Sequence, residues 1–251
     1  MNRATFYDAI RSLFGGTIRQ SQIDGCEALL AATDGLLITH RAYLFATALH
    51  ETASTMQPVR ETLAKTDESA VNRLESAWKA GKLGQVKTPY WRFDTQGKTW
   101  LGRGYVQLTH RDNYQKAAAL TGVDLLGDPN KAMQPTVAAK ILVDGCIIGI
   151  FTGKKLSDYL PGDYKGARRV VNGQDKAAAI AGYAVAFEAA LRAAGASEAV
   201  STPKPAPKPS PGKKPGVAGP LVAGGVVAAG AAWAWACKIP FLAWLFSSCG
   251  G

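Results

Sequence analysis

The sequence LLITHRAYLFATALHET, residues 36–52, joins a long apolar segment to a histidine, a glutamate and a threonine. From Leu36 to Leu49, apolar residues occur on almost every side of the predicted helix, which is typical of a helix buried in a protein core. Residues 136–151 have the same character, and residues 177–194 form an amphipathic segment that ends at Gly195. These segments predict a mostly α-helical domain.

Two further helices and one irregular region are expected around this core. Residues 6–14 show helical spacing of apolar side chains, and two glycines follow them. Thr66 is placed to cap another helix, which ends before Gly81. Residues 82–104 are rich in glycine, proline and aromatic residues and lack a clear period, so this region is predicted to be rich in loops, with room for a short hairpin. We assign residues 1–198 to one domain.

The charge and the cysteines limit the class of protein. The chain has 251 residues, a formal net charge of +10 and a pI near 9.5. Its last 51 residues contain five lysines and no acidic residue, which favours an anionic partner for the tail. The first sixteen residues lack the apolar centre of a signal peptide, so we do not expect export by that route. None of the four cysteines forms a CxxC pair, and Cys26 and Cys146 are interpreted as buried thiols made in a reducing compartment.

The C-terminal part has a different composition. Residues 199–216 are rich in proline and lysine and predict an extended linker. Residues 217–246 are mostly apolar, and the charge-free stretch at their start is about twenty residues long, enough to cross a bilayer as a helix. The alternative is a Gly/Ala-rich tail that packs on the domain. Because lysines flank the segment mainly on its N-terminal side, the positive-inside bias places the N-terminal domain in the cytoplasm.

Two glutamates, Glu51 and Glu61, are candidates for paired acid–base chemistry. On one continuous helix they would be roughly 15 Å apart and on different faces. Pro58 breaks such a helix, and we expect a new helix to begin there. Glu51 would then lie at the negative end of a helix dipole in apolar surroundings, which favours the protonated acid. Glu61, in the first turns of the next helix and beside Arg60, would be the ionised base.

The motifs around these glutamates resemble glycoside hydrolase family 19, which contains plant chitinases and many phage endolysins. His50-Glu51-Thr52 matches the family's acid motif, and the segment from Gly102 to Thr109, GRGYVQLT, matches its Gly-Arg-Gly motif. Val171-Asn172-Gly173 resembles its Ile-Asn-Gly. The likeness covers about residues 5–195 and is closer to the phage branch, because the gap between the glutamates is short and the cysteines do not fit the plant disulfides.

The resemblance implies a lysozyme-like domain of two lobes and assigns roles to several residues. Glu51 would be the catalytic acid and Glu61 the base. Thr109 would help to hold the attacking water. The implied substrate contacts are Gln107, Asn113 and Asn172.

Other candidates for the substrate site have structural alternatives. Arg103 would contact the substrate or anchor a carboxylate inside the protein. Tyr90 and Trp91 would stack on a sugar face or fill the loop region; we favour stacking. Tyr105 is expected to pack in the core. Ser54 stands where a zinc-protease HExxH motif needs its second histidine, so no metal is expected, and no cofactor either.

The sequence therefore predicts an endolysin that hydrolyses β-1,4 bonds of peptidoglycan with inversion during host lysis. Its expected partners are the glycan strands and, through residues 217–246, the membrane. The protein would be a monomer tethered to the inner membrane in the host cytoplasm and would depend on a holin to reach the wall. It is not expected to bind nucleic acid, because its prolines separate the lysines and no aromatic platform accompanies them. The alternatives are a chitinase, a lytic transglycosylase, or a wall-binding or membrane-perturbing protein without catalysis.

Overall fold

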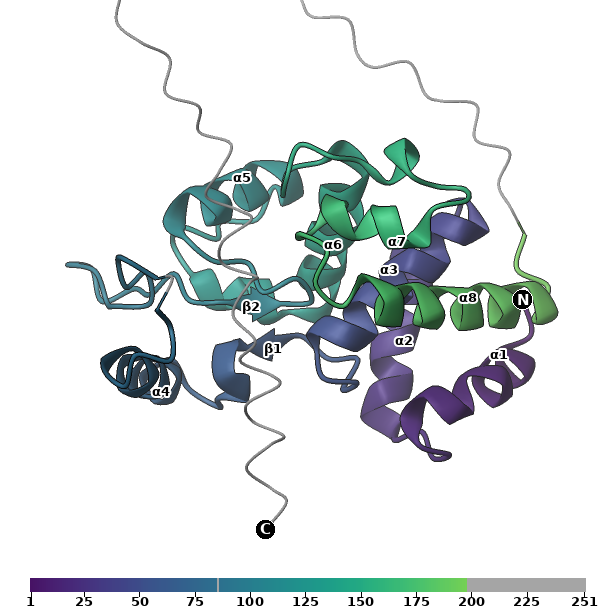
Figure 1. The fold of residues 1–251 in the computed structure, drawn as a ribbon, viewed down its shortest axis with the longest axis horizontal. Helices are drawn as coiled ribbons and strands as arrows, with labels where there is room; N and C mark the ends of the chain where they lie inside the picture. The colour runs from purple at the N-terminus through teal and green to yellow at the C-terminus, as the bar shows by residue number, and fades with distance from the viewer. Residues whose placement is uncertain (85, 198–251) are drawn as a thin grey trace, which may run out of the picture.

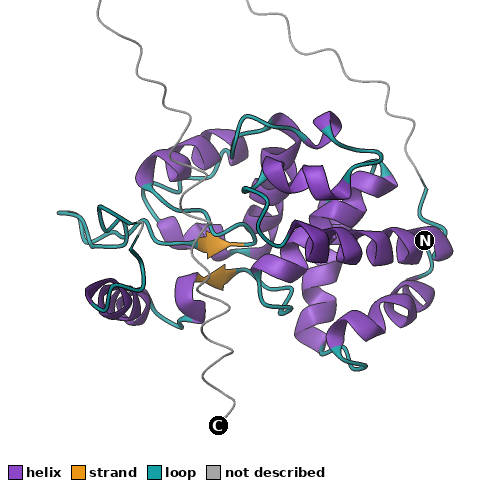
Figure 2. Ribbon diagram, viewed as in Figure 1, coloured by secondary structure: helices purple, strands orange, loops and turns teal. Residues whose placement is uncertain are grey.

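The computed structural model describes residues 1–84 and 86–197, and this part of the chain is mostly α-helical, as predicted (Figure 2). Short 3-10 turns connect several of the helices. The α-helices in the described part are α1 (Arg3–Ile10), α2 (Gln20–Ala32), α3 (Ile38–Glu51), α4 (Asp67–Lys79), α5 (Arg111–Thr121), α6 (Pro135–Ile148), α7 (Tyr164–Ala167) and α8 (Ala177–Ala193).

Helix α3 is buried along most of its length, which confirms the prediction from residues 36–49. It packs against α8, and the Phe45 ring lies 5.2 Å from the Phe187 ring between their centroids. Phe6 of α1, which also packs against α8, contacts Phe45 edge to face at 5.8 Å. Since burial of such side chains contributes about 1.5–3 kcal/mol each, these contacts hold α1 and α8 against α3 (Figure 1).

Helix α6 is the second apolar helix and packs against α2 and α5. It begins at Pro135, whose missing N–H costs nothing in a first helical turn, and it ends at Gly149, which has a left-handed φ of 81°. Cys146 in α6 and Cys26 in α2 are both buried free thiols, as predicted. Burial raises the pKa of the Cys26 thiol to about 12, so it stays protonated.

A second, smaller group of apolar side chains forms around α4, which lies apart from α1 and α8 on the far side of the strands (Figure 1). The predicted cap is present, because the Thr66 hydroxyl accepts a hydrogen bond from the Ser69 N–H at 3.2 Å. Leu74, Leu83 and Trp91 belong to this group, whereas the core around α3 and α6 forms a separate cluster.

Two short antiparallel strands join the regions, β1 (Val59–Arg60) and β2 (Arg103–Gly104). Val59 pairs with Gly104, and Arg60 with Arg103. The expected helix starting at Pro58 is therefore wrong: the chain continues as β1 and then as a 3-10 turn, Glu61–Leu63. The left-handed φ of 61° at Thr62 is incompatible with an α-helix there.

Within residues 1–84 and 86–197, no helix combines the length and the apolar character needed to cross a membrane. The predicted linker, residues 199–216, and the predicted membrane segment, residues 217–246, lie outside the described residues.

Candidate active site

Glu51 is the last residue of α3 and is only 8% exposed. Its Oε1 accepts a hydrogen bond from Nη1 of Arg168 at 2.7 Å. Arg168 is itself 2% exposed and begins a 3-10 turn, Arg168–Val170. The two residues therefore form an ion pair that is largely removed from water.

The sequence argument did not include this arginine. The sequence shows two adjacent arginines, Arg168 and Arg169, shortly before the Val-Asn-Gly motif. It does not indicate which of the two is buried. Glu51 therefore has a buried cationic partner that comes from a distant part of the chain.

Glu61 lies after β1, and both of its carboxylate oxygens accept hydrogen bonds. The Tyr90 hydroxyl donates to Oε1 at 2.6 Å, and the Gly102 N–H donates to Oε2 at 2.7 Å. Burial raises the pKa of Glu61, whereas these two hydrogen bonds act in the opposite direction. The residue as a whole is half-buried, but its carboxylate points into the protein. Burial of the carboxylate is therefore the dominant influence on the pKa of Glu61.

The expected influence of Arg60 on Glu61 is wrong. The Arg60 Nε donates to Asp67 Oδ1 at 2.6 Å, and its Nη1 donates to the Lys65 carbonyl at 2.7 Å. Alternation along β1 explains this, because neighbouring residues of a strand point to opposite faces. Glu61 therefore has a tyrosine and a backbone amide as its partners in place of the predicted arginine.

Gln107 and Glu61 both approach the backbone of Gly102. The Gln107 Nε2 donates to the carbonyl of Val59 in β1 at 3.0 Å. A Cβ atom added to Gly102 would lie 2.7 Å from Gln107 Oε1 and 3.2 Å from Glu61 Oε2. Glycine is the residue that fits this position, because both side chains approach its backbone so closely.

Thr109 and Asn113 follow on the same segment and are mostly buried, at 4% and 5% exposure. Between them, His110 has a left-handed φ of 65°, and its ring centroid lies 4.5 Å from that of Tyr90. The segment that carries the predicted water-holding and substrate-binding residues is thus placed next to the tyrosine that holds Glu61.

Arg103 anchors a carboxylate inside the protein, which is the second of the two roles expected for it, and it is not placed as a substrate contact. It is 1% exposed and donates to Asp67 Oδ2 at 2.7 Å and to the Tyr114 hydroxyl at 2.8 Å. Its Nη1 also donates to the carbonyl of Thr99 at 3.0 Å. An arginine that is held by internal groups in this way fixes β2 instead of binding a ligand.

Trp91 is also fully buried, so the predicted stacking of Trp91 on a sugar is wrong. Its indole N–H donates to Glu75 of α4 at 2.9 Å. Tyr90 is half-buried and contacts the Trp91 ring edge to face at 5.0 Å. Tyr105 is buried with its hydroxyl bonded to the Met56 carbonyl at 3.2 Å, as the core-packing prediction requires.

Asn172 lies on the Glu51 side. It is 2% exposed, its N–H donates to the Arg168 carbonyl at 2.9 Å, and its Oδ1 accepts from the Gly173 N–H at 2.7 Å. The residues around the two glutamates therefore form two groups: Glu51 with Arg168 and Asn172, and Glu61 with Tyr90, Gly102 and Gln107. Residues 52–60 connect the two groups along the chain.

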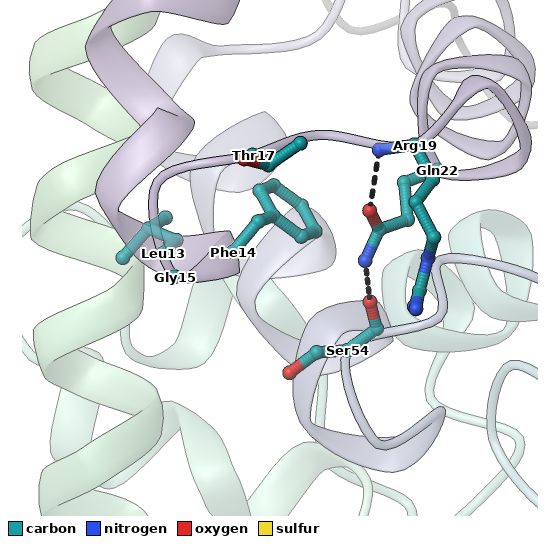
Figure 3. A pocket seen from close by; sticks show the side chains of 7 residues that line it. All are labelled: Leu13, Phe14, Gly15, Thr17, Arg19, Gln22 and Ser54. Atoms are coloured by element: carbon teal, nitrogen blue, oxygen red, sulfur yellow. Dashed lines mark hydrogen bonds between the residues drawn. The ribbon is translucent and has the colours of Figure 1, made fainter.

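A cavity of about 520 Å³ opens beside the loop that follows Glu51. Gln22 accepts from the Arg19 N–H at 2.8 Å and donates to the Ser54 carbonyl at 2.8 Å across one wall, and the Phe14 ring forms another part (Figure 3). Neither Glu51 nor Glu61 lines this cavity, so we do not assign the chemistry to it.

No group of three or more potential metal-binding side chains occurs among the described residues. Comparison with protein-family models, curated proteins and solved structures finds no match to this chain. The functional assignment accordingly depends on the motifs and on the geometry of the two carboxylates.

Proposed function

We propose that this protein is a glycoside hydrolase similar to family 19, and that it cleaves β-1,4 bonds of peptidoglycan with inversion. The observation that carries the proposal is the contact between two motifs that are distant in the sequence. The Gly102 N–H donates to Glu61, and Gln107 donates to the carbonyl of Val59. The Gly-Arg-Gly motif therefore packs on the segment of the second glutamate, as one glycosidase site would require.

The proposed chemistry divides hydrolysis between the two carboxyl groups. One carboxylic acid gives its proton to the glycosidic oxygen as the bond from that oxygen to the anomeric carbon breaks. The other, ionised carboxylate takes a proton from a water that attacks the same carbon from the opposite face. By the resemblance, Glu51 is the acid and Glu61 is the base, Thr109 holds the water, and Gln107, Asn113 and Asn172 bind the sugars.

The exchanged assignment has its own support. The raised pKa of Glu61, which results from its burial, favours a proton donor at that position. An aryl glycoside with a good leaving group needs little proton donation. If Glu51 is the acid, Glu51→Gln retains activity on that substrate and Glu61→Gln loses it; the exchanged roles predict the reverse.

Charge supports peptidoglycan over chitin as the substrate. Chitin is neutral, whereas the peptide branches of peptidoglycan carry carboxylates. A chain with a net charge of +10 is attracted to the second polymer over long range. The chitinase remains the nearest alternative, since the same two carboxyl groups would cleave N-acetylglucosamine polymers.

The two separate apolar clusters support a lysozyme-like domain of two lobes. One cluster surrounds α3, α6 and α8, and the other surrounds α4. Glu61 and strand β1 lie along the chain between Met56 of the first cluster and Ala64 of the second. In this proposal the substrate binds between the lobes, as the resemblance implies.

The location of the protein follows from the C-terminal sequence. We propose that residues 217–246 hold the domain at the inner face of the membrane as a monomer, and that a holin gives it access to the wall. The lysines before the segment support this orientation.

The test is digestion of purified peptidoglycan by the full-length protein in a non-ionic detergent, with chitin in parallel and mass spectrometry of the products. New reducing ends on peptidoglycan fragments support the proposal. Anhydro ends would identify a lytic transglycosylase, and cleavage of chitin alone would identify a chitinase. Absence of product from both polymers would favour the non-enzymatic alternative.

A further inference from the structure

A second cavity, of about 490 Å³, lies at the end of the molecule where the N-terminus and the end of α8 meet (Figure 1). Its walls include Leu30, Asp34 and Arg41, together with Ala196 and Ser197 after α8. Arg41 and Glu51 are ten residues apart on α3, which corresponds to about 15 Å along the helix. This cavity is therefore separate from the two groups of proposed catalytic residues.

Arg41 is the unusual residue of this cavity. Its side chain lines the cavity although the residue is only 4% exposed. Its Nε is buried without a hydrogen-bond partner, and among residues 1–84 and 86–197 no ion pair or hydrogen bond is formed by its guanidinium. The guanidinium therefore faces the cavity without an acceptor from the described residues, and an anion in the cavity would supply one.

The acidic residues nearby do not supply that anion. Asp34 is exposed and acts on Arg41 only at longer range. Glu27 is already paired with Arg3, whose Nε lies 3.0 Å from Glu27 Oε2. Burial lowers the pKa of Arg41, which is the direction expected for a cation that lacks a close counter-ion.

We propose that this cavity binds a phosphate group, with Arg41 as the main ligand. A guanidinium matches the oxygens of phosphate with two parallel hydrogen bonds. Arg41 lies in the first turn of α3, and Arg3 begins α1, so two positive helix ends face the cavity. The C-terminal ends of α2 and α8 lie at the same cavity and act against an anion, so the Arg41 guanidinium is the main source of attraction.

The phosphate has two sources, a phospholipid headgroup or free phosphate. Ala196 and Ser197 lie in the cavity wall, and the chain continues from them toward the linker and the apolar residues 217–246. A domain attached to a membrane through this end would present the cavity to lipid headgroups. The same chemistry would also retain inorganic phosphate from solution.

The test is thermal unfolding of the full-length protein, in a non-ionic detergent, in increasing sodium phosphate against sodium chloride of equal ionic strength. The midpoint of the wild-type protein rises with phosphate and saturates, because a ligand that binds the folded state stabilises it. Arg41→Met removes this rise. Arg19→Met is the matched control, since Arg19 lines the other cavity but is exposed, and it behaves as the wild type.

Replacement of an uncompensated buried charge by an apolar side chain is tolerated, so Arg41→Met should fold. If it does not, Arg41→Lys carries the test, because it retains the charge and loses the paired hydrogen bonds. It should need about tenfold more phosphate for the half-maximal effect. Equal responses to phosphate and chloride in the wild type, or an undiminished response in Arg41→Met or Arg41→Lys, would overturn the proposal.

Vesicles distinguish the two sources. Full-length protein and Arg41→Met are compared on vesicles of phosphatidylcholine and of phosphatidylcholine with phosphatidylglycerol. Stronger retention of the wild type than of the variant, only on the anionic vesicles, identifies a lipid headgroup as the ligand. If both kinds of vesicle retain the wild type and Arg41→Met equally, while phosphate raises the unfolding midpoint only when Arg41 is present, the ligand is free phosphate.

Discussion

Arg168 Nη1 lies 2.7 Å from Glu51 Oε1, and the two residues are 2% and 8% exposed. The contact joins positions 117 residues apart and brings the 3-10 turn after α7 to the end of α3. Because each charge is held by the other in a place with little water, the loss of either partner should weaken this corner of the fold.

Removal of Arg168 alone should destabilise the fold. Arg168→Met leaves the Glu51 carboxylate buried without its partner, and the free energy of unfolding should fall by about 3 kcal/mol or more in chemical denaturation. Arg192→Gln is the control, because the Arg192–Glu188 pair is half-exposed, and its effect should stay below about 1 kcal/mol. The double variant Arg168→Met/Glu51→Gln should recover part of the loss; no recovery would contradict an electrostatic role for the pair.

The Glu61 carboxyl group should give the fold a specific dependence on pH. Because burial raises the pKa of Glu61 above its ordinary value of 4.5, the folded state holds this proton more tightly than the unfolded state. Stability from this group is present below the ordinary pKa and is lost as pH rises through the folded pKa. Chemical denaturation of the wild type and of Glu61→Gln is measured as pH rises from below 4.5. Only the wild type should lose the part of its free energy of unfolding that comes from Glu61.

Tyr90 should tune Glu61 without being needed for the fold. The Tyr90 hydroxyl donates to Oε1 of Glu61 and so lowers its pKa relative to burial alone. Tyr90→Phe should therefore shift the limb of the pH–rate profile that belongs to Glu61 to higher pH. A profile that keeps its position while activity falls would show that Tyr90 acts by another route.

Gly102 should not accept a side chain. In Gly102→Ala the new Cβ would lie 2.7 Å from Gln107 Oε1 and 3.3 Å from Glu61 Cβ, so the protein should lose about 1–3 kcal/mol of stability and most of its activity. Gly182 in α8 is the control, because nothing lies within 4 Å of a Cβ there. Gly182→Ala should gain about 0.5–1 kcal/mol from helix propensity. Equal tolerance at both positions would refute the close packing around Glu61.

The apolar C-terminal segment should be separable from the chemistry. Deletion of residues 217–251 should release the protein from membranes in a flotation assay, while turnover of purified peptidoglycan stays close to that of the full-length protein. Loss of turnover after this deletion would show that the domain and the tail are not independent in function.

The sequence was sufficient for the elements whose signals are local. Helix α3 follows from an apolar run that only a buried helix explains, and α4 follows from the Thr66 cap and the glycine after it. Pro58 also predicts the break after Glu51. The conformation after this break is not predicted by the sequence, because β1 forms only by pairing with β2, more than forty residues later. In addition, Thr62 has a left-handed φ that no local sequence pattern indicates.

The partners of the glutamates are the part that sequence reasoning missed. Arg60 is adjacent to Glu61 in the chain but points toward Asp67, while Arg168 reaches Glu51 from a distant turn. Trp91 and Arg103 have the residue types of a sugar site and yet are buried and bonded internally. Residues that are adjacent in the sequence therefore do not predict the partners of these side chains, because tertiary packing determines the direction in which each side chain points.

The most direct measurement of the central claim is the rate at which Glu51→Gln, Glu61→Gln and the control Glu75→Gln hydrolyse purified peptidoglycan, with the fold of each checked by circular dichroism. Glu75 pairs with Arg92 and belongs to neither proposed catalytic group. We predict losses of about 10²–10⁴-fold for the first two variants, since each removes a group that transfers a proton in the reaction, and little change for the third. Turnover near the wild-type rate by a folded Glu51→Gln or Glu61→Gln variant would contradict the account.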